Sequence, residues 1–370
     1  MESFIIVGVG ILGASTAYNL AKRNKHVIMI DREEKGCATD AAAGIICPWL
    51  SQRRNKKWYQ LARNGAAHYP TLIKSLETDG ETNTGYRQVG ALSIHTDEKK
   101  LDAMMERAMK RRQDAPEIGS IQKLNKLETN NQFPLLSDDY QSVYVSGAAR
   151  VNGRSLRESL INGAVKNGAT FIKGSATPLR EQHDITGVKV NNETYHADKV
   201  IITTGAWLHE HEALLDIPFQ LTRQKAQIMH LKMPHTKTRH WPVVIPPSDQ
   251  YMLTLGDDRI IVGATHENDV DDDINVTAGG IEEILTKAFQ IAPSLAKCTV
   301  LETRVGFRPF TPGFLPLIGE LPHLKGVLFA NGLGASGLTM GPYIGTLLTS
   351  LALEKQPDID VSPYRVEENI

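Results

Sequence analysis

The residues best suited to chemistry lie near the start of the chain, where three glycines and an acid follow short apolar runs. Residues 4–7 are Phe-Ile-Ile-Val, residues 8–13 are Gly-Val-Gly-Ile-Leu-Gly, and Asp31 closes the apolar run at 27–30. In a βαβ unit, Gly8 allows a tight turn, Gly10 lets the backbone approach a pyrophosphate, and Gly13 lets the helix pack against the strand. Asp31 can accept both hydroxyls of an adenosine ribose. The pattern therefore predicts a site for an ADP-bearing dinucleotide.

Two later segments consist of residues that are common where the backbone lies against a cofactor. Residues 41–46 are mostly small, and the apolar run at 200–202 leads into Thr203-Thr204-Gly205. Small side chains let a backbone approach a flat ring, but a packed helix-to-loop transition or a crossing of two loops has the same composition. The opening unit by itself fits NAD as well as FAD.

Composition excludes several classes of protein. The 370 residues are 41% hydrophobic and 22% charged with a net charge of -1, so nothing in the electrostatics favours nucleic acid. Cys37, Cys47 and Cys298 lack metal-like spacing, so we expect free thiols in a reducing cytoplasm and no metal. The first strand begins too early to leave room for a signal peptide, which also favours a cytoplasmic location.

Two stretches of the sequence look like a membrane span and a calcium-binding loop, but each lacks features of that structure. Residues 326–353 carry no charged side chain, but their glycines and a proline favour a strand, a glycine loop and a buried helix over a membrane span. The acidic run 269–273 lacks the glycine and distal glutamate of a calcium loop, so we expect a solvated turn that caps the next helix.

Hydrophobic periodicity predicts helices over 58–76, 99–112, 156–167 and 281–291, with strands between them and a hairpin at 251–265. The sheet-rich part is inserted in two pieces. The expected fold is α/β: a Rossmann-like domain of residues 1–84, 146–218 and 302–370, with an α+β substrate domain of residues 85–145 and 219–301.

Taken together, these segments resemble the D-amino-acid oxidase, glycine oxidase and sarcosine oxidase family of flavoenzymes, which includes D-amino-acid dehydrogenases. The likeness spans nearly the whole chain and is greatest to glycine oxidase. The motifs that carry it are residues 8–13 with Asp31-Arg32, residues 39–45, residues 203–207, residues 306–309, and the glycine loop at 332–342.

The resemblance implies a non-covalent FAD, because Gly306 stands where sarcosine oxidases attach flavin through cysteine. The first helix would hold the pyrophosphate, Leu179 would contact the adenine, and the segment 43–45 would line the isoalloxazine ring. Backbone N–H groups at the start of the last helix would stabilise reduced flavin. The implied cofactor-binding residues are Gly8, Gly10, Leu12, Gly13, Asp31, Arg32, Thr39, Ala43, Gly44, Ile45, Leu179, Gly205, Gly332, Leu333, Gly334, Ala335, Ser336, Gly337, Leu338 and Thr339.

The resemblance also implies the substrate end. Arg308 would bind the carboxylate of an amino acid through two parallel hydrogen bonds, so that Cα lies against flavin N5. Tyr251 stands where glycine oxidase has a substrate-contacting tyrosine, and His266 where a side chain faces the reactive side of the flavin. Ala335 replaces a second substrate arginine, so the pocket has room for a larger or differently shaped amine.

The implied activity is hydride transfer from Cα of a small amino acid to flavin, giving an imine that hydrolyses to a 2-oxo acid. The substrate would be glycine, a D-amino acid or an N-methyl amino acid. Two alternatives stay open from the residues: an NAD(P)-dependent dehydrogenase, and a flavoprotein with a structural or assembly role. A dehydrogenase would add a quinone or peripheral membrane contact, and a homo-oligomer is compatible with the sequence.

Overall fold

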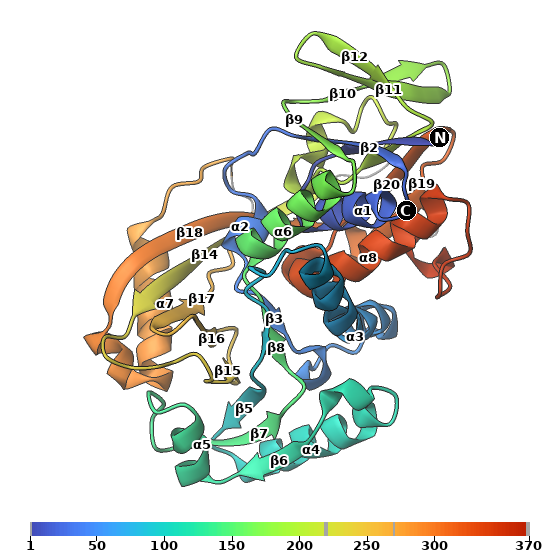
Figure 1. The fold of residues 1–370 in the computed structure, drawn as a ribbon. Helices are drawn as coiled ribbons and strands as arrows, with labels where there is room; N and C mark the ends of the chain where they lie inside the picture. Colours follow the sequence, from blue (N-terminus) through green and yellow to red (C-terminus); the bar gives the residue numbers. More distant parts are fainter. Residues whose placement is uncertain (1, 218–220, 269–270, 368–370) are drawn as a thin grey trace.

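The structure is a computed structural model that describes residues 2–217, 221–268 and 271–367. Its first sheet has six strands in the order β19-β20-β13-β1-β2-β9, and neighbouring strands are parallel except the antiparallel edge strand β19 (Figure 1). The strands are β1 (Ser3–Val7), β2 (His26–Asp31), β9 (Thr170–Lys173), β13 (Lys199–Ile202), β19 (Leu317–Glu320) and β20 (Val327–Asn331).

This sheet is covered on both faces, because successive side chains of β1 point to opposite sides. Phe4 and Ile6 join a core that includes several helices, whereas Ile5 and Val7 join a second core that includes residues of a three-stranded sheet. Figure 1 shows the helices and the three-stranded sheet on either side of β1 and β2. These elements are α1 (Ile11–Ala21), α3 (Lys56–Thr78), α6 (Gly153–Lys166), α8 (Gly337–Ala352), β10 (Thr177–Glu181), β11 (Asp184–Val190) and β12 (Glu193–His196).

A second, eight-stranded sheet has the order β18-β14-β17-β16-β15-β5-β7-β6. The long strands β14 and β18 pair along their whole length, and α7 packs on this sheet through Ile284 and Ala288. Its strands and helices are β5 (Ala91–His95), β6 (Ile121–Leu124), β7 (Gln141–Val145), β14 (Thr222–Lys232), β15 (Val243–Ile245), β16 (Tyr251–Leu255), β17 (Arg259–Gly263), β18 (Thr299–Phe310), α4 (Glu98–Arg112), α5 (Lys126–Gln132) and α7 (Ala278–Ile291).

Short elements join the two sheets. A three-stranded sheet consists of β3 (Ile45–Ile46), β8 (Ala149–Arg150) and β4 (Arg87–Gln88), and α2 (Ala38–Ala41) lies just before β3. Two 3-10 turns, η3 (Gly205–Glu210) and η6 (Gly334–Ser336), follow β13 and β20. They place glycine-containing backbone at the carboxyl ends of these parallel strands.

The expected α/β fold is confirmed, as are the predicted helices and the hairpin, which is the antiparallel pair β16 and β17. The division into two domains stays a prediction. Its boundary at 302 would cut β18, which pairs with β14 from Thr299 to Phe310, so we propose a boundary after Phe310.

The uncharged stretch 326–353 and the acidic run 269–273 form neither a membrane span nor a metal site in the described residues. Residues 326–353 contain β20, η6 and α8, and no helix in the described ranges is both long and apolar enough to span a bilayer. In the acidic run, Asp269 lies outside the described residues, and Asp272 and Asp273 pair with Arg223 and Lys225. Thr277, not the acidic run, caps α7. The described ranges contain no cluster of three potential metal ligands.

Candidate active site

One cavity extends from the carboxyl ends of β1 and β2 to the face of the eight-stranded sheet at β14, β16 and β18. Ligands of open parallel sheets bind at these strand ends. The cavity brings together most of the predicted site residues: Gly8, Gly10, Leu12, Asp31, Arg32, Thr39, Ala43, Gly44, Ile45, Gly205, Leu333, Gly334, Ala335, Gly337, Leu338, Thr339, Tyr251, His266 and Arg308.

Two predicted glycines lie outside the cavity wall and act through packing. A Cβ on Gly13 would lie 2.0 Å from the carbonyl oxygen of Gly8, so glycine at 13 lets α1 approach the turn after β1. A Cβ on Gly332 would lie 2.3 Å from the Thr311 hydroxyl oxygen. Both glycines support the cavity without lining it.

Two further predicted residues are also outside the wall. Ser336 lies 3.3 Å from the indole nitrogen of Trp58, and its hydroxyl accepts a hydrogen bond from that indole. Leu179 lies within β10 and pairs with Gly187, whereas the wall beside β2 and β9 contains Gly174, Ser175 and Ala176. The adenine contact assigned to Leu179 therefore stays a prediction, with residues 174–176 lying nearer to the cavity.

At the end of the cavity next to β1, the backbone at Gly10 is accessible and hydrogen bonds orient the carboxylate of Asp31. A Cβ on Gly10 would meet only the Thr39 hydroxyl, at 3.4 Å, so this backbone is accessible to a large group. Asp31 accepts hydrogen bonds from the backbone N–H groups of Val9 and Glu33 at 2.5 and 2.6 Å. Thr39 accepts from the N–H of Ile11 at 3.0 Å. These features fit the ribose and pyrophosphate of a dinucleotide.

Three charged residues at this end were missed by sequence reasoning. Arg157 of α6 donates to the Val9 carbonyl at 2.6 Å and lies 3.6 Å from Asp31. Glu210 of η3 accepts two hydrogen bonds from Arg32, both 2.7 Å long. Glu34 also pairs with Arg32 at 2.9 Å. No local motif marks Arg157 or Glu210, because only the fold brings α6 and η3 to β2.

The middle of the cavity is shaped by glycine and a helix end. Gly44 has φ of +86°, and a Cβ there would lie 1.8 Å from the Val151 carbonyl oxygen, so no other residue fits. Thr339 donates to the Ile45 carbonyl at 3.0 Å, which holds α8 against β3. The first turn of α8 has no side-chain cap, and Gly337 and Leu338 line the cavity. A flat group with developing negative charge fits here.

The far end of the cavity has a partly buried cation. Arg308 of β18 hydrogen-bonds to the side-chain oxygen of Gln224 at 2.8 Å, and it has no carboxylate within ion-pair distance in the described part of the chain. Burial lowers the pKa of Arg308, and it raises the pKa of the neighbouring Tyr251 hydroxyl. Both groups keep their usual charge at neutral pH, so Arg308 offers a cation to an anionic ligand.

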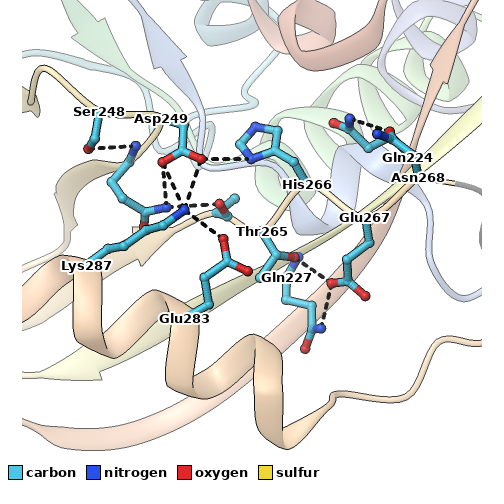
Figure 2. Close-up of polar contacts among 12 residues, drawn as sticks. Gln224, Gln227, Ser248, Asp249, Thr265, His266, Glu267, Asn268, Glu283 and Lys287 are labelled. Atoms are coloured by element: carbon cyan, nitrogen blue, oxygen red, sulfur yellow. Dashed lines mark hydrogen bonds and ion pairs between the residues drawn. The ribbon is translucent and has the colours of Figure 1, made fainter.

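His266 and Asp249 lie on the same cavity wall (Figure 2). His266 Nδ1 is 3.6 Å from Asp249 Oδ2, and Lys287 of α7 donates to both Asp249 oxygens at 3.1 and 3.2 Å. Burial, and then the charge of Arg308, lower the pKa of His266. Burial raises the pKa of Asp249, but the hydrogen bonds from Lys287 and Gln250 outweigh it, so the carboxylate stays ionised.

Asp249 was missed because nothing in its sequence context suggests a site. It follows Ser248 in a loop before β16, and its partners come from residues 266 and 287. Its position two residues before Tyr251, where β16 begins, does not by itself identify it.

Comparisons with known proteins identify the family of the chain. A family model described as FAD dependent oxidoreductase matches residues 3–351. The chain is 60% identical over 365 residues to "Uncharacterized oxidoreductase YurR" of Bacillus subtilis (strain 168). The alignment covers 98% of this chain and 98% of the relative. It is 40% identical to the crystal structure of iminodiacetate oxidase (IdaA) from Chelativorans sp. BNC1, with a TM-score of 0.95 and 98% of both chains covered.

Glycine oxidase is a more distant relative. The enzyme of Geobacillus kaustophilus is 25% identical over 370 residues, which covers 99% of this chain and 96% of the relative. The crystal structure of glycine oxidase from the same organism has a TM-score of 0.88. Since the family match spans almost the whole chain and the cavity fits a dinucleotide, this chain belongs to the FAD dependent oxidoreductase family, is an enzyme of that family, and has FAD as its cofactor.

Proposed function

We propose that this enzyme oxidises the Cα–N bond of a small amino acid to an imine, which water hydrolyses to a 2-oxo acid and an amine. The observation that carries the proposal is Arg308, a cation in the cavity wall that hydrogen-bonds to the neutral Gln224 and has no carboxylate within ion-pair distance among the described residues. FAD supplies the hydride acceptor when it is bound. The protein supplies orientation, which is what hydride transfer requires most.

Arg308 would fix the substrate by its carboxylate. A guanidinium binds a carboxylate through two parallel charge-assisted hydrogen bonds, which set both the position and the orientation of the attached Cα. Gln224 holds the guanidinium by one N–H and leaves other donors available. Tyr251 lies beside Arg308, so its hydroxyl would contact the same carboxylate.

The proposed substrates include amino acids whose nitrogen carries a second carbon substituent. Ala335 lies in the cavity wall at the place of a second arginine in glycine oxidase, and its methyl group leaves space there. Iminodiacetate, the substrate named for the 40% identical structure, is therefore a candidate alongside glycine, D-amino acids and N-methyl amino acids. All of these carry an α-carboxylate that Arg308 would bind.

FAD would lie along the cavity with its adenosine at β2 and its ring at α8. We propose that Asp31 binds the ribose, that Ala176 in place of Leu179 lies against the adenine, and that Gly44 lies against the flavin ring. The uncapped start of α8 would face the ring edge that gains negative charge on reduction. Gly306 has no side chain that could bond to the flavin, so binding would be non-covalent.

The test is a product assay on the purified holoenzyme. Glycine, sarcosine, iminodiacetate, proline and a set of D-amino acids would be supplied with oxygen and, separately, with a soluble quinone analogue under argon. We expect a 2-oxo acid from at least one of them, and the two arms identify the electron acceptor. Bound FAD without any 2-oxo acid would favour a structural or assembly role instead. Gel filtration of the same sample measures the oligomeric state, for which a homo-oligomer is compatible with the sequence.

A further inference from the structure

The His266 and Asp249 pair has no part in binding a carboxylate, yet both side chains line the cavity that contains Arg308. An amino acid arrives in water mainly with a protonated amine, and an ammonium nitrogen has no lone pair to support loss of hydride from Cα. We propose that His266 Nε2 accepts this proton from the substrate and that Asp249 positions the ring. This inference rests on the proposed function and assigns the proton acceptor of that reaction.

The geometry leaves one ring nitrogen free for the substrate. Asp249 Oδ2 lies 3.6 Å from Nδ1, which directs Nε2 away from the carboxylate (Figure 2). No hydrogen bond to either ring nitrogen of His266 is found within residues 2–217, 221–268 and 271–367. The separation of 3.6 Å exceeds a hydrogen bond, but such contacts in ligand-free sites often tighten when the substrate binds.

Asp249 is held firmly enough to orient the ring. Lys287 bridges both of its oxygens, and Glu283, one turn earlier on α7, accepts from the same ammonium at 2.8 Å. The side-chain amide of Gln250 lies 3.4 Å from Asp249 Oδ1. The carboxylate is therefore anionic and would stabilise an imidazolium formed beside it.

A competing role for His266 is a second cationic anchor for a dicarboxylate. The charged groups that act on its ring are Arg308 on β18, Asp249 before β16, and Lys287 and Glu283 on α7. Their net effect, together with burial, lowers the pKa of His266, so the ring is neutral at pH 7 in the free enzyme. A neutral imidazole offers no positive charge to a second carboxylate, but it can accept a proton.

Substrate binding would strengthen this base at the moment it is needed. A carboxylate on Arg308 neutralises the positive charge that disfavours protonation of His266. The N–H bond of the ammonium then breaks, its electron pair stays on nitrogen, and the proton forms a bond to Nε2. The resulting imidazolium faces Asp249 and later releases its proton to water. Atoms and charge balance without any further reactant.

The first test does not depend on turnover. Acetate binding to the holoenzyme is measured by calorimetry in two buffers with different protonation enthalpies, which gives the number of protons taken up. Near pH 6 we expect proton uptake by the wild type and by the control His196→Asn, which alters an exposed histidine of β12. His266→Asn should bind acetate without that uptake.

Two charge variants give effects of opposite sign. Lys287→Met removes a cation near His266, so the pH of maximal uptake should rise, whereas Asp249→Asn removes an anion, so it should fall. Equal uptake by His266→Asn and the wild type would overturn the proposal. So would failure of acetate to bind, because the proposal needs a carboxylate on Arg308.

The second test separates a base from a structural role. Anaerobic flavin reduction by a reactive amino acid is followed from pH 6 to 10 in the wild type, His266→Asn and His196→Asn. Loss of a general base should slow His266→Asn about 100-fold at pH 7 and much less at pH 10, where a large part of the amine is already neutral. An equal decrease at every pH would contradict the proposal. If acetate causes proton uptake but no amino acid reduces the flavin, the proposed function is contradicted, whereas proton uptake by His266 is not.

Discussion

Arg308 is the residue on which the substrate assignment depends most. Arg308→Ala should raise the KM for the amino acid at least about 100-fold, because two charge-assisted hydrogen bonds are lost and each contributes about 1.5–3 kcal/mol. FAD should remain bound, since Arg308 lies at the end of the cavity away from β1. Steady-state kinetics and the visible spectrum measure the two effects.

The matched control is Arg54→Ala, which removes an exposed arginine outside the cavity and should leave KM unchanged. Arg308→Lys keeps the charge but not the planar fork, so its KM should lie between those of the wild type and the alanine variant. An unchanged KM in Arg308→Ala would remove this residue from the substrate site.

His230 is a second residue with a measurable consequence, this time for stability. It is fully buried on β14, and burial followed by the charge of Arg304 lowers its pKa to about 3. Its ordinary pKa of 6.5 applies in the unfolded chain, which therefore binds a proton that the folded chain does not bind between pH 6.5 and 3. Stability contributed by the neutral ring is full above pH 6.5 and declines as the pH falls through this window.

The prediction is a pH slope. From pH 6 to 5 this histidine should lower the free energy of unfolding by up to about 1.4 kcal/mol per pH unit, and His230→Gln should remove that part of the slope. The pKa of Glu302 is lowered to about 2, chiefly by its hydrogen bond from Arg304. Its contribution to the free energy of unfolding therefore declines only below pH 4.5, outside this range. Urea unfolding of the holoenzyme at both pH values measures the slope, and identical slopes would contradict this assignment.

Single residues also show the limits of sequence reasoning. The apolar spacing of α4 would put Met109 on the same side as the buried Leu101 and Met104, but Met109 is 43% exposed. The helix buries a narrower stripe than its apolar residues suggest. Leu179 was assigned through the family resemblance and stays a prediction, whereas the wall at the turn between β9 and β10 contains Ala176.

At the scale of elements, an ion pair joins two segments that border the nucleotide end of the cavity. Arg32 follows β2, Glu210 ends η3, and two hydrogen bonds of 2.7 Å connect them. Both side chains line the cavity and are about one-third exposed, at 30% and 34%. The pair would close part of the opening over bound adenosine.

Glu210→Gln should therefore release FAD faster, by up to about fivefold, since a solvent-exposed ion pair contributes about 0.2–1 kcal/mol. Large dilution of the holoenzyme, with the fluorescence of released FAD followed over time, measures the rate. Glu320→Gln, an exposed acid on β19 outside the cavity, is the control. Equal rates in all three proteins would show that the pair does not retain the cofactor.

Most elements could be predicted because their causes are local. The turn at Gly8, the periodicity of α4 and the hairpin at 256–258 are encoded within a few residues each. The pairing of β15 with β5 could not be predicted, because it joins Val243 to Ala91 in parallel and depends on the whole sheet. The contact between Asp249 and Lys287 likewise exists only after α7 has packed on that sheet.

For the molecule as a whole, the expected non-covalent state of FAD is directly testable. Gly306 contributes no side chain, and a Cβ there would meet Ala41 at 2.6 Å, so the wall is close-packed without a linking group. Acid precipitation should leave all of the flavin colour in the supernatant. Colour that stays with the precipitated protein would mean a covalent bond, for which Cys37 in the cavity wall would be the residue to examine.

The cavity as a whole combines segments that lie far apart in the sequence. β1 and β2 supply the nucleotide end, α8 supplies the ring edge, and β14, β16 and β18 supply the substrate end. Motif order and spacing predicted these segments through family resemblance, while Arg157, Glu210 and Asp249 became visible only once the chain was folded.

The central claim is that an amino acid held by Arg308 reduces the bound FAD. Its most direct test is anaerobic mixing of the holoenzyme with glycine, sarcosine or iminodiacetate while the oxidised-flavin absorbance band is followed. We predict that at least one of them bleaches the band with a rate that saturates, and that Arg308→Ala shifts the half-saturating concentration upward at least about 100-fold. Flavin that dithionite reduces but no amino acid reduces would contradict the account.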